Sequence, residues 1–314
     1  MGYRAPFPVA LEQVEYVKLY FHLEIDTYFD LPKLGLLQLR RELMQALKTC
    51  SGDADVASLK QLLQPELSSD PVVLRQVQKP APALVISPDI SYHGLMEPKQ
   101  QLVLPILFIG SGVHSIIPFI TLLQQLEKQG MYHGSGTFRL VEIDVEDGSG
   151  TKSHFWSVGT SPIALSPPIS NLAWWLERQQ PLTDRVDFEV ISPIRALHKG
   201  RPLFKAHFSA VFPLLLRRVS ALINAHTGVE LVDDPGYFFD RAARVKSAGK
   251  PLRWRDWRTL KSPQGEQNLG GLMGTLNLEG AVLEEMWWLL YLGSLFNIGK
   301  GAAYGAGQYR LSYS

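Results

Sequence analysis

The carboxy-terminal end of the chain reads Asn297-Ile298-Gly299-Lys300-Gly301-Ala302-Ala303-Tyr304-Gly305-Ala306-Gly307-Gln308-Tyr309-Arg310-Leu311. Its four glycines and three alanines offer no large side chain with which to build a core. Glycine tolerates positive φ and lets a ligand approach main-chain N–H groups closely. A series of such N–H groups beside one lysine suits a phosphate backbone. The same stretch is equally compatible with a tight connection between a helix and a closing strand, and both interpretations stay open.

Two stretches of the sequence come near to known nucleotide-binding motifs. The phosphate-binding loop G-x-x-x-x-G-K-[ST] does not fit, because Gly293 lies one residue too far from Gly299 and Gly301 replaces the hydroxyl residue. The stretch 110–115, Gly-Ser-Gly-Val-His-Ser, resembles a dinucleotide fingerprint without its third glycine. It keeps a nucleotide-dependent oxidoreductase open as a minor alternative.

The composition describes a globular protein with a substantial core. The chain has 314 residues, of which 46% are hydrophobic and 19% charged, enough for one large or two ordinary domains. The single cysteine, Cys50, excludes an internal disulfide and any zinc site built from several cysteines. No apolar run reaches the length of a membrane span, and residues 1–6 lack a secretory signal. We therefore expect a cytoplasmic protein that does not contact a membrane.

Charge is distributed unevenly along a chain whose net charge is only +1. Residues 1–184 hold 14 Lys and Arg against 19 Asp and Glu, whereas residues 185–314 hold 17 against 11. A basic second half on a nearly neutral chain predicts a localised surface for a polyanion.

Hydrophobic periodicity predicts the same order of elements twice. Residues 15–26 alternate apolar and polar as in a strand with one buried face, and residues 34–50 and 116–129 have helical spacing. The first half then reads strand, helix, two strands, helix and strand, with strands at 15–26, 83–87, 102–109 and 137–145. The second half repeats this order, with strands at 186–197, 252–260, 272–278 and 308–313 and helices at 204–226 and 283–296. This is the ferredoxin-like order.

The last strands of the two halves also share a short motif. Gly136-Thr137-Phe138-Arg139-Leu140 matches Gly307-Gln308-Tyr309-Arg310-Leu311 as glycine, any residue, aromatic, arginine and leucine. Such a repeat indicates two copies of one unit. We predict an α+β protein with two tandem ferredoxin-like domains, at residues 1–150 and 185–314, joined by a linker at 151–184.

A basic and aromatic segment lies within the second half. Residues 241–261 contain eight Lys and Arg together with Trp254 and Trp257, opposed after Asp240 only by Asp256. Arginines pair with phosphates, and aromatic rings stack on unpaired bases. A single-stranded or hairpin RNA is the partner that this segment predicts; a solvated hairpin with inward-facing tryptophans is the alternative.

Taken together, these stretches resemble the CRISPR repeat-processing endoribonucleases, the sixth Cas family of the RAMP superfamily. The resemblance covers nearly the whole chain and is strongest from residue 191 onward. It is carried by Ile191-Ser192-Pro193-Ile194-Arg195, Leu216-Arg217-Arg218, Trp257-Arg258, Gly270-Gly271-Leu272-Met273-Gly274 and the glycine-rich stretch 297–307.

The resemblance implies tandem ferredoxin-like domains and metal-independent cleavage of a CRISPR repeat, without a cofactor. In that reaction a 2′-hydroxyl attacks the adjacent phosphate and leaves 2′,3′-cyclic phosphate and 5′-hydroxyl ends. It needs a base, an acid and donors for the phosphorane, and histidine suits the first two roles. Many family members carry a histidine in or just after the first helix, whereas residues 34–50 here contain none.

The catalytic candidates are therefore His93 and His22, assisted by Tyr28 or Lys33. The RNA-binding candidates are Arg40, Arg41, Arg253, Arg255, Arg258, Gly299, Lys300, Gly301, Tyr304, Gly305 and Gly307. The expected partners are CRISPR repeat RNA and other CRISPR effector or adaptation proteins, including within a longer fusion. A non-catalytic RAMP module that positions guide RNA is the alternative function.

Overall fold

The computed structural model describes residues 7–50, 52–66, 80–132, 134–160, 166–198, 200–262 and 265–313. The chain divides into two compact units. One consists of Ala10–Trp175 with Ala221–Val229, and is called the N-terminal unit below. The other consists of Met1–Val9, Leu176–Ser220 and Glu230–Ser314, and is called the C-terminal unit.

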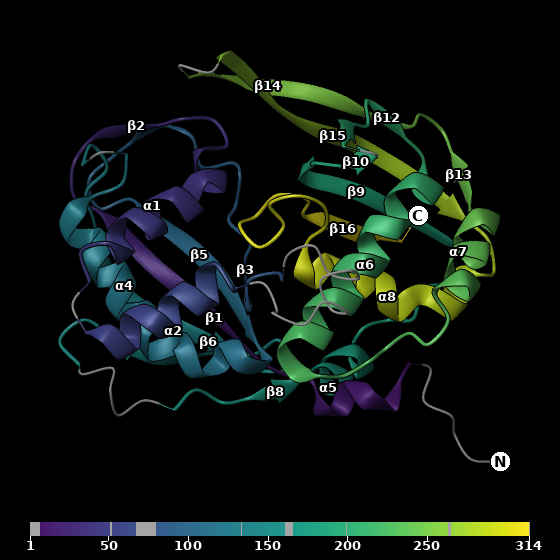
Figure 1. Ribbon diagram of the computed structural model, residues 1–314, viewed down its shortest axis with the longest axis horizontal. Coiled ribbons are helices and arrows are strands. Elements are labelled where there is room, and N and C mark those ends of the chain that lie inside the picture. The colour runs from purple at the N-terminus through teal and green to yellow at the C-terminus, as the bar shows by residue number, and fades with distance from the viewer. Residues whose placement is uncertain are drawn as a thin grey trace. The chain divides into compact units, whose positions relative to one another are not determined.

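The N-terminal unit is built on an antiparallel sheet whose strands lie in the order β3-β5-β1-β6-β7, with β8 paired to β1. The helices α1, α2 and α4 lie together on one face of this sheet (Figure 1). Its strands are β1 (Glu15–Ile25), β3 (Leu84–Ile86), β5 (Gln101–Ile109), β6 (Phe138–Glu146), β7 (Lys152–Ser157) and β8 (Ser170–Asn171). Its helices are α1 (Leu39–Leu47), α2 (Asp53–Leu63), α4 (Ile116–Gln129) and α5 (Leu172–Glu177), with short 3-10 helices η1 (Val9–Gln13), η2 (Gly35–Gln38) and η3 (Gly110–Ser115). A separate two-stranded ribbon pairs β2 (Phe29–Leu31) with β4 (Gly94–Met96).

Alternation along β1 determines which face of this sheet is buried. Leu19, Phe21 and Leu23 are buried, while the residues between them are only half-buried. Phe21 and Phe108 each meet Phe119 of α4 edge to face, with ring centroids 5.8 and 5.4 Å apart. The apolar face therefore packs on the helices, and the polar face of β1 points away from them.

The C-terminal unit contains a second antiparallel sheet, in the order β12-β14-β15-β9-β16, with β13 paired to β15. Its strands are β9 (Arg185–Ile194), β12 (Lys205–Ala206), β13 (Lys246–Ala248), β14 (Leu252–Ser262), β15 (Gly265–Glu279) and β16 (Tyr309–Ser312), and a small ribbon pairs β10 (Leu197–His198) with β11 (Arg201–Pro202). Its helices are α7 (Pro235–Arg244), α8 (Leu283–Phe296) and most of α6 (Phe208–Thr227). Phe188 of β9 is fully buried and stacks on Tyr309 of β16 at 4.1 Å between centroids.

Both sheets confirm the predicted ferredoxin-like fold. The four strands of each repeat lie in the order second, third, first and fourth: β3, β5, β1 and β6 in one sheet and β14, β15, β9 and β16 in the other. The helices α4 and α8 occupy the predicted residues. The main difference lies within residues 151–184, expected to be a linker, where β7, β8 and α5 form and the two strands extend the first sheet. The domain limits at 150 and 185 stay a prediction.

The shared motif occupies equivalent positions in the two sheets. Arg139 of β6 lies opposite Glu24 of β1 and forms an ion pair with it at 2.7 Å. Arg310 of β16 lies opposite Glu189 of β9 and pairs with it at 2.5 Å. In each unit the last strand thus joins the first through the same arginine and glutamate.

One helix in the described part of the chain, α6, is long and apolar enough to cross a membrane by length and composition alone. Half of its apolar window is buried inside the protein, so length and composition alone are weak evidence for a span.

Candidate functional site

The polar face of the first sheet pairs His22 with an acidic residue that the sequence analysis did not select. The imidazole Nε2 of His22 on β1 lies 2.9 Å from Oδ2 of Asp144 on β6, and both side chains are partly buried. A carboxylate in this position orients the ring. The period-two spacing of Glu142, Asp144 and Glu146 is the signal that marks this face in the sequence.

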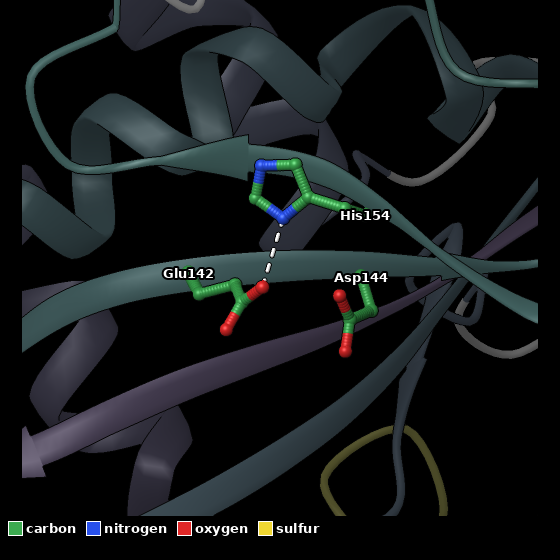
Figure 2. Close-up of side chains that lie close together, drawn as sticks. All are labelled: Glu142, Asp144 and His154. Atoms are coloured by element: carbon green, nitrogen blue, oxygen red, sulfur yellow. Dashed lines mark hydrogen bonds and ion pairs between the residues drawn. The ribbon is translucent and has the colours of Figure 1, made fainter.

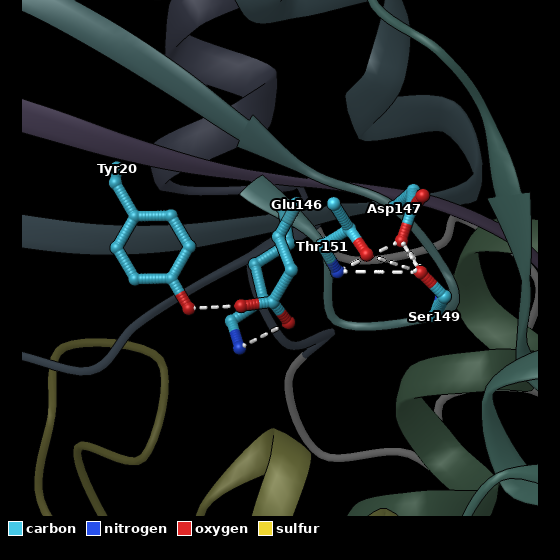
Figure 3. A network of polar contacts seen from close by, with 6 residues as sticks. Tyr20, Glu146, Asp147, Ser149 and Thr151 are labelled. Atoms are coloured by element: carbon cyan, nitrogen blue, oxygen red, sulfur yellow. Dashed lines mark hydrogen bonds and ion pairs between the residues drawn. The ribbon is translucent and has the colours of Figure 1, made fainter. Parts of the chain in front are cut away.

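Further along the same face, Glu146 accepts hydrogen bonds from two neighbours on β1 (Figure 3). Lys18 Nζ donates to Oε1 at 2.8 Å, and the Tyr20 hydroxyl donates to Oε2. The ammonium group of Lys152 lies 3.5 Å from the centre of the Tyr20 ring. Burial, followed by the hydrogen bond to Glu146, raises the pKa of Tyr20 well above its ordinary value. Tyr20 therefore keeps its proton at neutral pH and acts only as a hydrogen-bond donor.

The other three catalytic candidates lie around the β2–β4 ribbon. At one end of the ribbon, Leu31 of β2 pairs with Gly94 of β4. Lys33 comes two residues after Leu31, and His93 comes directly before Gly94, so both belong to this end. Tyr28 directly precedes β2 at the other end, and all three side chains are exposed. The structure thus places Lys33 and His93, which are 60 positions apart in sequence, at the same end of one ribbon. His22 belongs to the sheet face described above.

The two arginines of α1 have different surroundings. The guanidinium of Arg40 is exposed and donates to the amide oxygen of Gln64 at 3.1 Å. Arg41 binds Oε1 of Glu42 through Nε and one terminal nitrogen, at 3.0 and 2.8 Å. The other oxygen of Glu42 accepts from the main-chain N–H of Tyr132 at 3.1 Å. Arg40 is therefore held by one hydrogen bond to an amide oxygen, whereas Arg41 is held by two to a carboxylate.

The glycine-rich stretch differs from the open cradle of N–H groups that the sequence analysis allowed. Residues 302–307 are buried, while Lys300 and Gly301 are exposed. The main-chain N–H groups of Lys300 and Gly307 donate to the carbonyls of Arg195 and Pro193. Small side chains allow the loop to fold onto the end of β9, where its backbone groups find hydrogen-bond partners. The structure therefore favours the second interpretation of this stretch, a tight connection between a helix and a closing strand. Tyr304, Gly305 and Gly307 are consequently buried. The part of the loop that is exposed to solvent is the turn at Lys300 and Gly301.

Close packing at Gly307 shows why this loop needs glycine. Its φ is +74°, and a Cβ added there would lie 1.8 Å from the carbonyl oxygen of Ile298. The hydroxyl of Ser192 bridges the same turn, donating to the Gly305 carbonyl at 2.5 Å and accepting from the Gln308 N–H at 2.8 Å. The Nε of Arg218 donates to the carbonyl of Phe296, where α8 ends, at 3.2 Å. Burial of its guanidinium lowers the pKa of Arg218 to about 10.

The basic and aromatic segment runs from the end of α7 through β13 into β14, which pairs with β15 in a long hairpin. Arg253 and Arg255 are exposed and, two residues apart, share one face of β14. On the other face the Trp254 ring lies 5.6 Å from the ring of Phe204, which is 67% exposed, and its indole N–H donates to Asp256 at 2.7 Å. A bulge between residues 256 and 258 interrupts the pairing with β15. The side chains of Trp257 and Arg258 lie outside the described part of the structure.

The alternative nucleotide-binding stretch at 110–115 forms the 3-10 helix η3, directly before α4. A Cβ at Gly110 would lie 2.3 Å from the carbonyl oxygen of His226, and one at Gly112 would lie 2.2 Å from that of Ala83. These two glycines therefore allow main-chain segments to pack together. This role accounts for them without a dinucleotide.

Comparison with known proteins agrees with this arrangement. Residues 188–309 match the family model described as CRISPR-associated endoribonuclease Cas6, and residues 14–167 match a second model described as an N-terminal domain. A comparison with curated proteins found no match.

Solved structures resemble the chain over nearly its whole length. A chain of a partial Cas6-RT-Cas1–Cas2 complex aligns with a TM-score of 0.58 and 16% identity, covering 96% of this chain and 46% of that one. Thermus thermophilus Cas6 (TTHB231) aligns with a TM-score of 0.53 and 14% identity, covering 95% of this chain and 99% of that one. The present chain therefore spans less than half of the aligned chain in the Cas6-RT-Cas1–Cas2 complex, and nearly all of Thermus thermophilus Cas6.

The two sheets and these likenesses define a fold of tandem ferredoxin-like units. Residues 188–309 resemble the family of CRISPR-associated Cas6 endoribonucleases, and the rest of the likeness to solved structures is one of fold.

Proposed function

We propose that this chain binds CRISPR repeat RNA and cleaves it within the repeat without a metal ion. The 2′-hydroxyl beside the scissile phosphate attacks, and the products carry 2′,3′-cyclic phosphate and 5′-hydroxyl ends. The family match at residues 188–309 supports RNA processing in general. The assignment of the chemistry to the N-terminal unit depends mainly on one observation, the position of Lys33 and His93 at the same end of the β2–β4 ribbon.

The two residues supply complementary chemistry. The imidazole of His93 acts as the base for the 2′-hydroxyl, and the ammonium group of Lys33 stabilises negative charge on the phosphorane. Both side chains are exposed, so a phosphate reaches them without rearrangement of the core. Tyr28, at the opposite end of the ribbon, is assigned to contact with the RNA or to donation of a proton to the leaving oxygen.

His22 is the second candidate for the base. Its ring is held by Asp144, and a general base oriented by a third group in this way is a recurrent arrangement in enzymes. A variant lacking His22 therefore separates the two possible sites. Loss of cleavage in this variant, with cleavage retained after substitution of His93, would move the chemistry to the sheet face.

Contact with the RNA is assigned chiefly to the C-terminal unit. The exposed guanidinium groups of Arg253 and Arg255 bind phosphates, and the Phe204–Trp254 pair offers an exposed ring for a base. Lys300 and Gly301 add a contact at the exposed turn of the glycine-rich loop. The remaining proposed contacts are Arg40, Arg41, Arg258, Gly299, Tyr304, Gly305 and Gly307. Of these, Tyr304, Gly305 and Gly307 are buried and support the loop from within.

Protein partners follow from the similarity to the Cas6-RT-Cas1–Cas2 chain. That protein joins Cas6 to a reverse transcriptase and to Cas1 and assembles with Cas2. We propose that the present chain likewise works beside CRISPR adaptation proteins, as one part of such a fusion or as a separate chain.

The cleavage proposal is tested by incubating the protein with a 5′-labelled repeat RNA in excess EDTA and determining the ends of the products. The expected result is a single cut with a 2′,3′-cyclic phosphate on the upstream fragment. Cleavage that requires a divalent ion would contradict the mechanism. Tight binding of the repeat without any cleavage would favour the alternative, a RAMP module that positions guide RNA.

A further inference from the structure

Three potential metal ligands converge on the polar face of the first sheet (Figure 2). Glu142 and Asp144 lie two residues apart on β6, so their side chains share one face of the strand. His154 on β7 lies opposite Asp144. One ligand atom from each residue lies within 4.8 Å of the other two.

We propose that Glu142, Asp144 and His154 bind one divalent transition-metal ion of the Zn²⁺ or Co²⁺ type. A ligand set of one imidazole and two carboxylates matches the nitrogen and oxygen preference of these ions. Ligands around Zn²⁺ at about 2.1 Å are roughly 3.4 Å apart, so rotation of these side chains suffices to close the site. Three protein ligands leave a coordination position open for water or a ligand.

The charges on this face favour a cation at the same place. The ring nitrogen Nδ1 of His154 lies 2.8 Å from Glu142, and Nε2 of His22 lies 2.9 Å from Asp144. With neutral imidazoles, the two carboxylates carry two negative charges close together. The lysines on this face are engaged elsewhere, Lys18 with Glu146 and Lys152 over the ring of Tyr20. A divalent ion would neutralise the two carboxylates directly.

His22 acts on this site as a positioning residue. Its Nε2 contacts Oδ2 of Asp144 and leaves Oδ1 available to the ion. Hydrogen-bonding partners that fix metal-binding carboxylates are general features of metal sites. The proposed ion is separate from the RNA chemistry assigned to Lys33 and His93, so EDTA should remove it without abolishing cleavage.

The proposal is tested with the whole chain, after EDTA treatment and desalting, by equilibrium dialysis against Zn²⁺ and by titration with Co²⁺. The expected results are one tightly bound ion per chain and a visible Co²⁺ absorption band. Glu142→Gln and His154→Gln should each abolish the band. His22→Gln should keep the band but weaken binding by roughly 10–100-fold, the usual effect of losing an outer partner.

The matched control is His207→Gln, which removes an exposed histidine from the C-terminal unit. It should bind Zn²⁺ like the unaltered protein, and circular dichroism verifies that each variant is folded. Absence of saturable binding to the unaltered chain would overturn the proposal. Equal binding by the His154→Gln variant would also overturn it, since the ion would then be held elsewhere.

Discussion

The two units use the same topology but differ at the connection between their second helix and last strand. In the N-terminal unit α4 ends at Gln129 and β6 begins at Phe138. In the C-terminal unit α8 ends at Phe296, and the longer glycine-rich stretch leads to Tyr309. The polar face of the first sheet carries histidine–carboxylate pairs, whereas β14 of the second displays arginines. The two units thus share one topology, while histidine–carboxylate pairs lie on the first sheet and exposed arginines lie on a strand of the second.

The largest effect is expected at the β2–β4 ribbon. His93→Ala should reduce the single-turnover cleavage rate by about 10²–10⁴-fold, the range for loss of a general base, and leave the Kd for repeat RNA within about twofold. Rates at saturating protein and a filter-binding titration measure the two quantities. Full-rate cleavage would remove His93 from the mechanism.

The next effect concerns the stability of the C-terminal unit. Gly307→Ala places a Cβ 1.8 Å from the Ile298 carbonyl oxygen at positive φ, so the loop must rearrange. We expect a loss of more than about 3 kcal/mol, which exceeds the usual cost of positive φ alone. Gly301→Ala is the matched control, because its φ is also positive but its Cβ has 3.4 Å of clearance from Ala306. Similar Tm values for the two variants would contradict the packing described for this loop.

A change in salt dependence is expected on β14. Replacing Arg253 and Arg255 together with alanine should reduce the slope of log Kd against log salt by about 1.4, which corresponds to two single-strand phosphate contacts. Arg139→Ala is the control, because this exposed arginine of the N-terminal unit already pairs with Glu24 and Asp26. If Arg139→Ala changed the slope as much as the double variant does, the assignment of the phosphate contacts to the C-terminal unit would be wrong.

The smallest effect is expected at Lys300. Its alanine variant should weaken binding of all RNA sequences alike and reduce the salt slope by about 0.7, the value for one single-strand phosphate contact. The same titrations provide this measurement, with two unrelated RNA sequences for comparison. An unchanged slope would show that the exposed turn of the glycine-rich loop does not touch a phosphate.

Most of the fold was predictable, because the spacing of apolar residues along the sequence depends directly on which face of each helix or strand is buried. The alternation of β1 and the apolar spacing of α4 and α8 predicted these elements to within about a residue. The strand β7 was missed because it lies at the edge of its sheet, and its sequence Lys-Ser-His-Phe-Trp-Ser lacks clear alternation. The prediction that one unit is repeated was confirmed by the equivalent Arg139–Glu24 and Arg310–Glu189 pairs.

The candidate site was less predictable, because its contacts depend on register. His22 was selected as part of a polar strand face, but its partner Asp144 follows from pairing with β6 across an irregularity near residue 22. The placement of Lys33 and His93 at one end of the β2–β4 ribbon likewise depends on strand pairing. The enclosure of the glycine-rich loop could not be inferred from composition, because glycine and alanine suit both an exposed cradle and a tightly packed turn.

Cross-linking of a non-cleavable repeat RNA, with a 2′-deoxy nucleotide at the cut site, tests the division of labour most directly. After ultraviolet irradiation, mass spectrometry identifies the cross-linked peptides. The account predicts that nucleotides beside the cut cross-link to the peptide containing Tyr92 and His93, and that other nucleotides of the same RNA cross-link to the peptide containing Phe204 or Trp254. Cross-links confined to one unit, or cut-site nucleotides attached to β14, would contradict it.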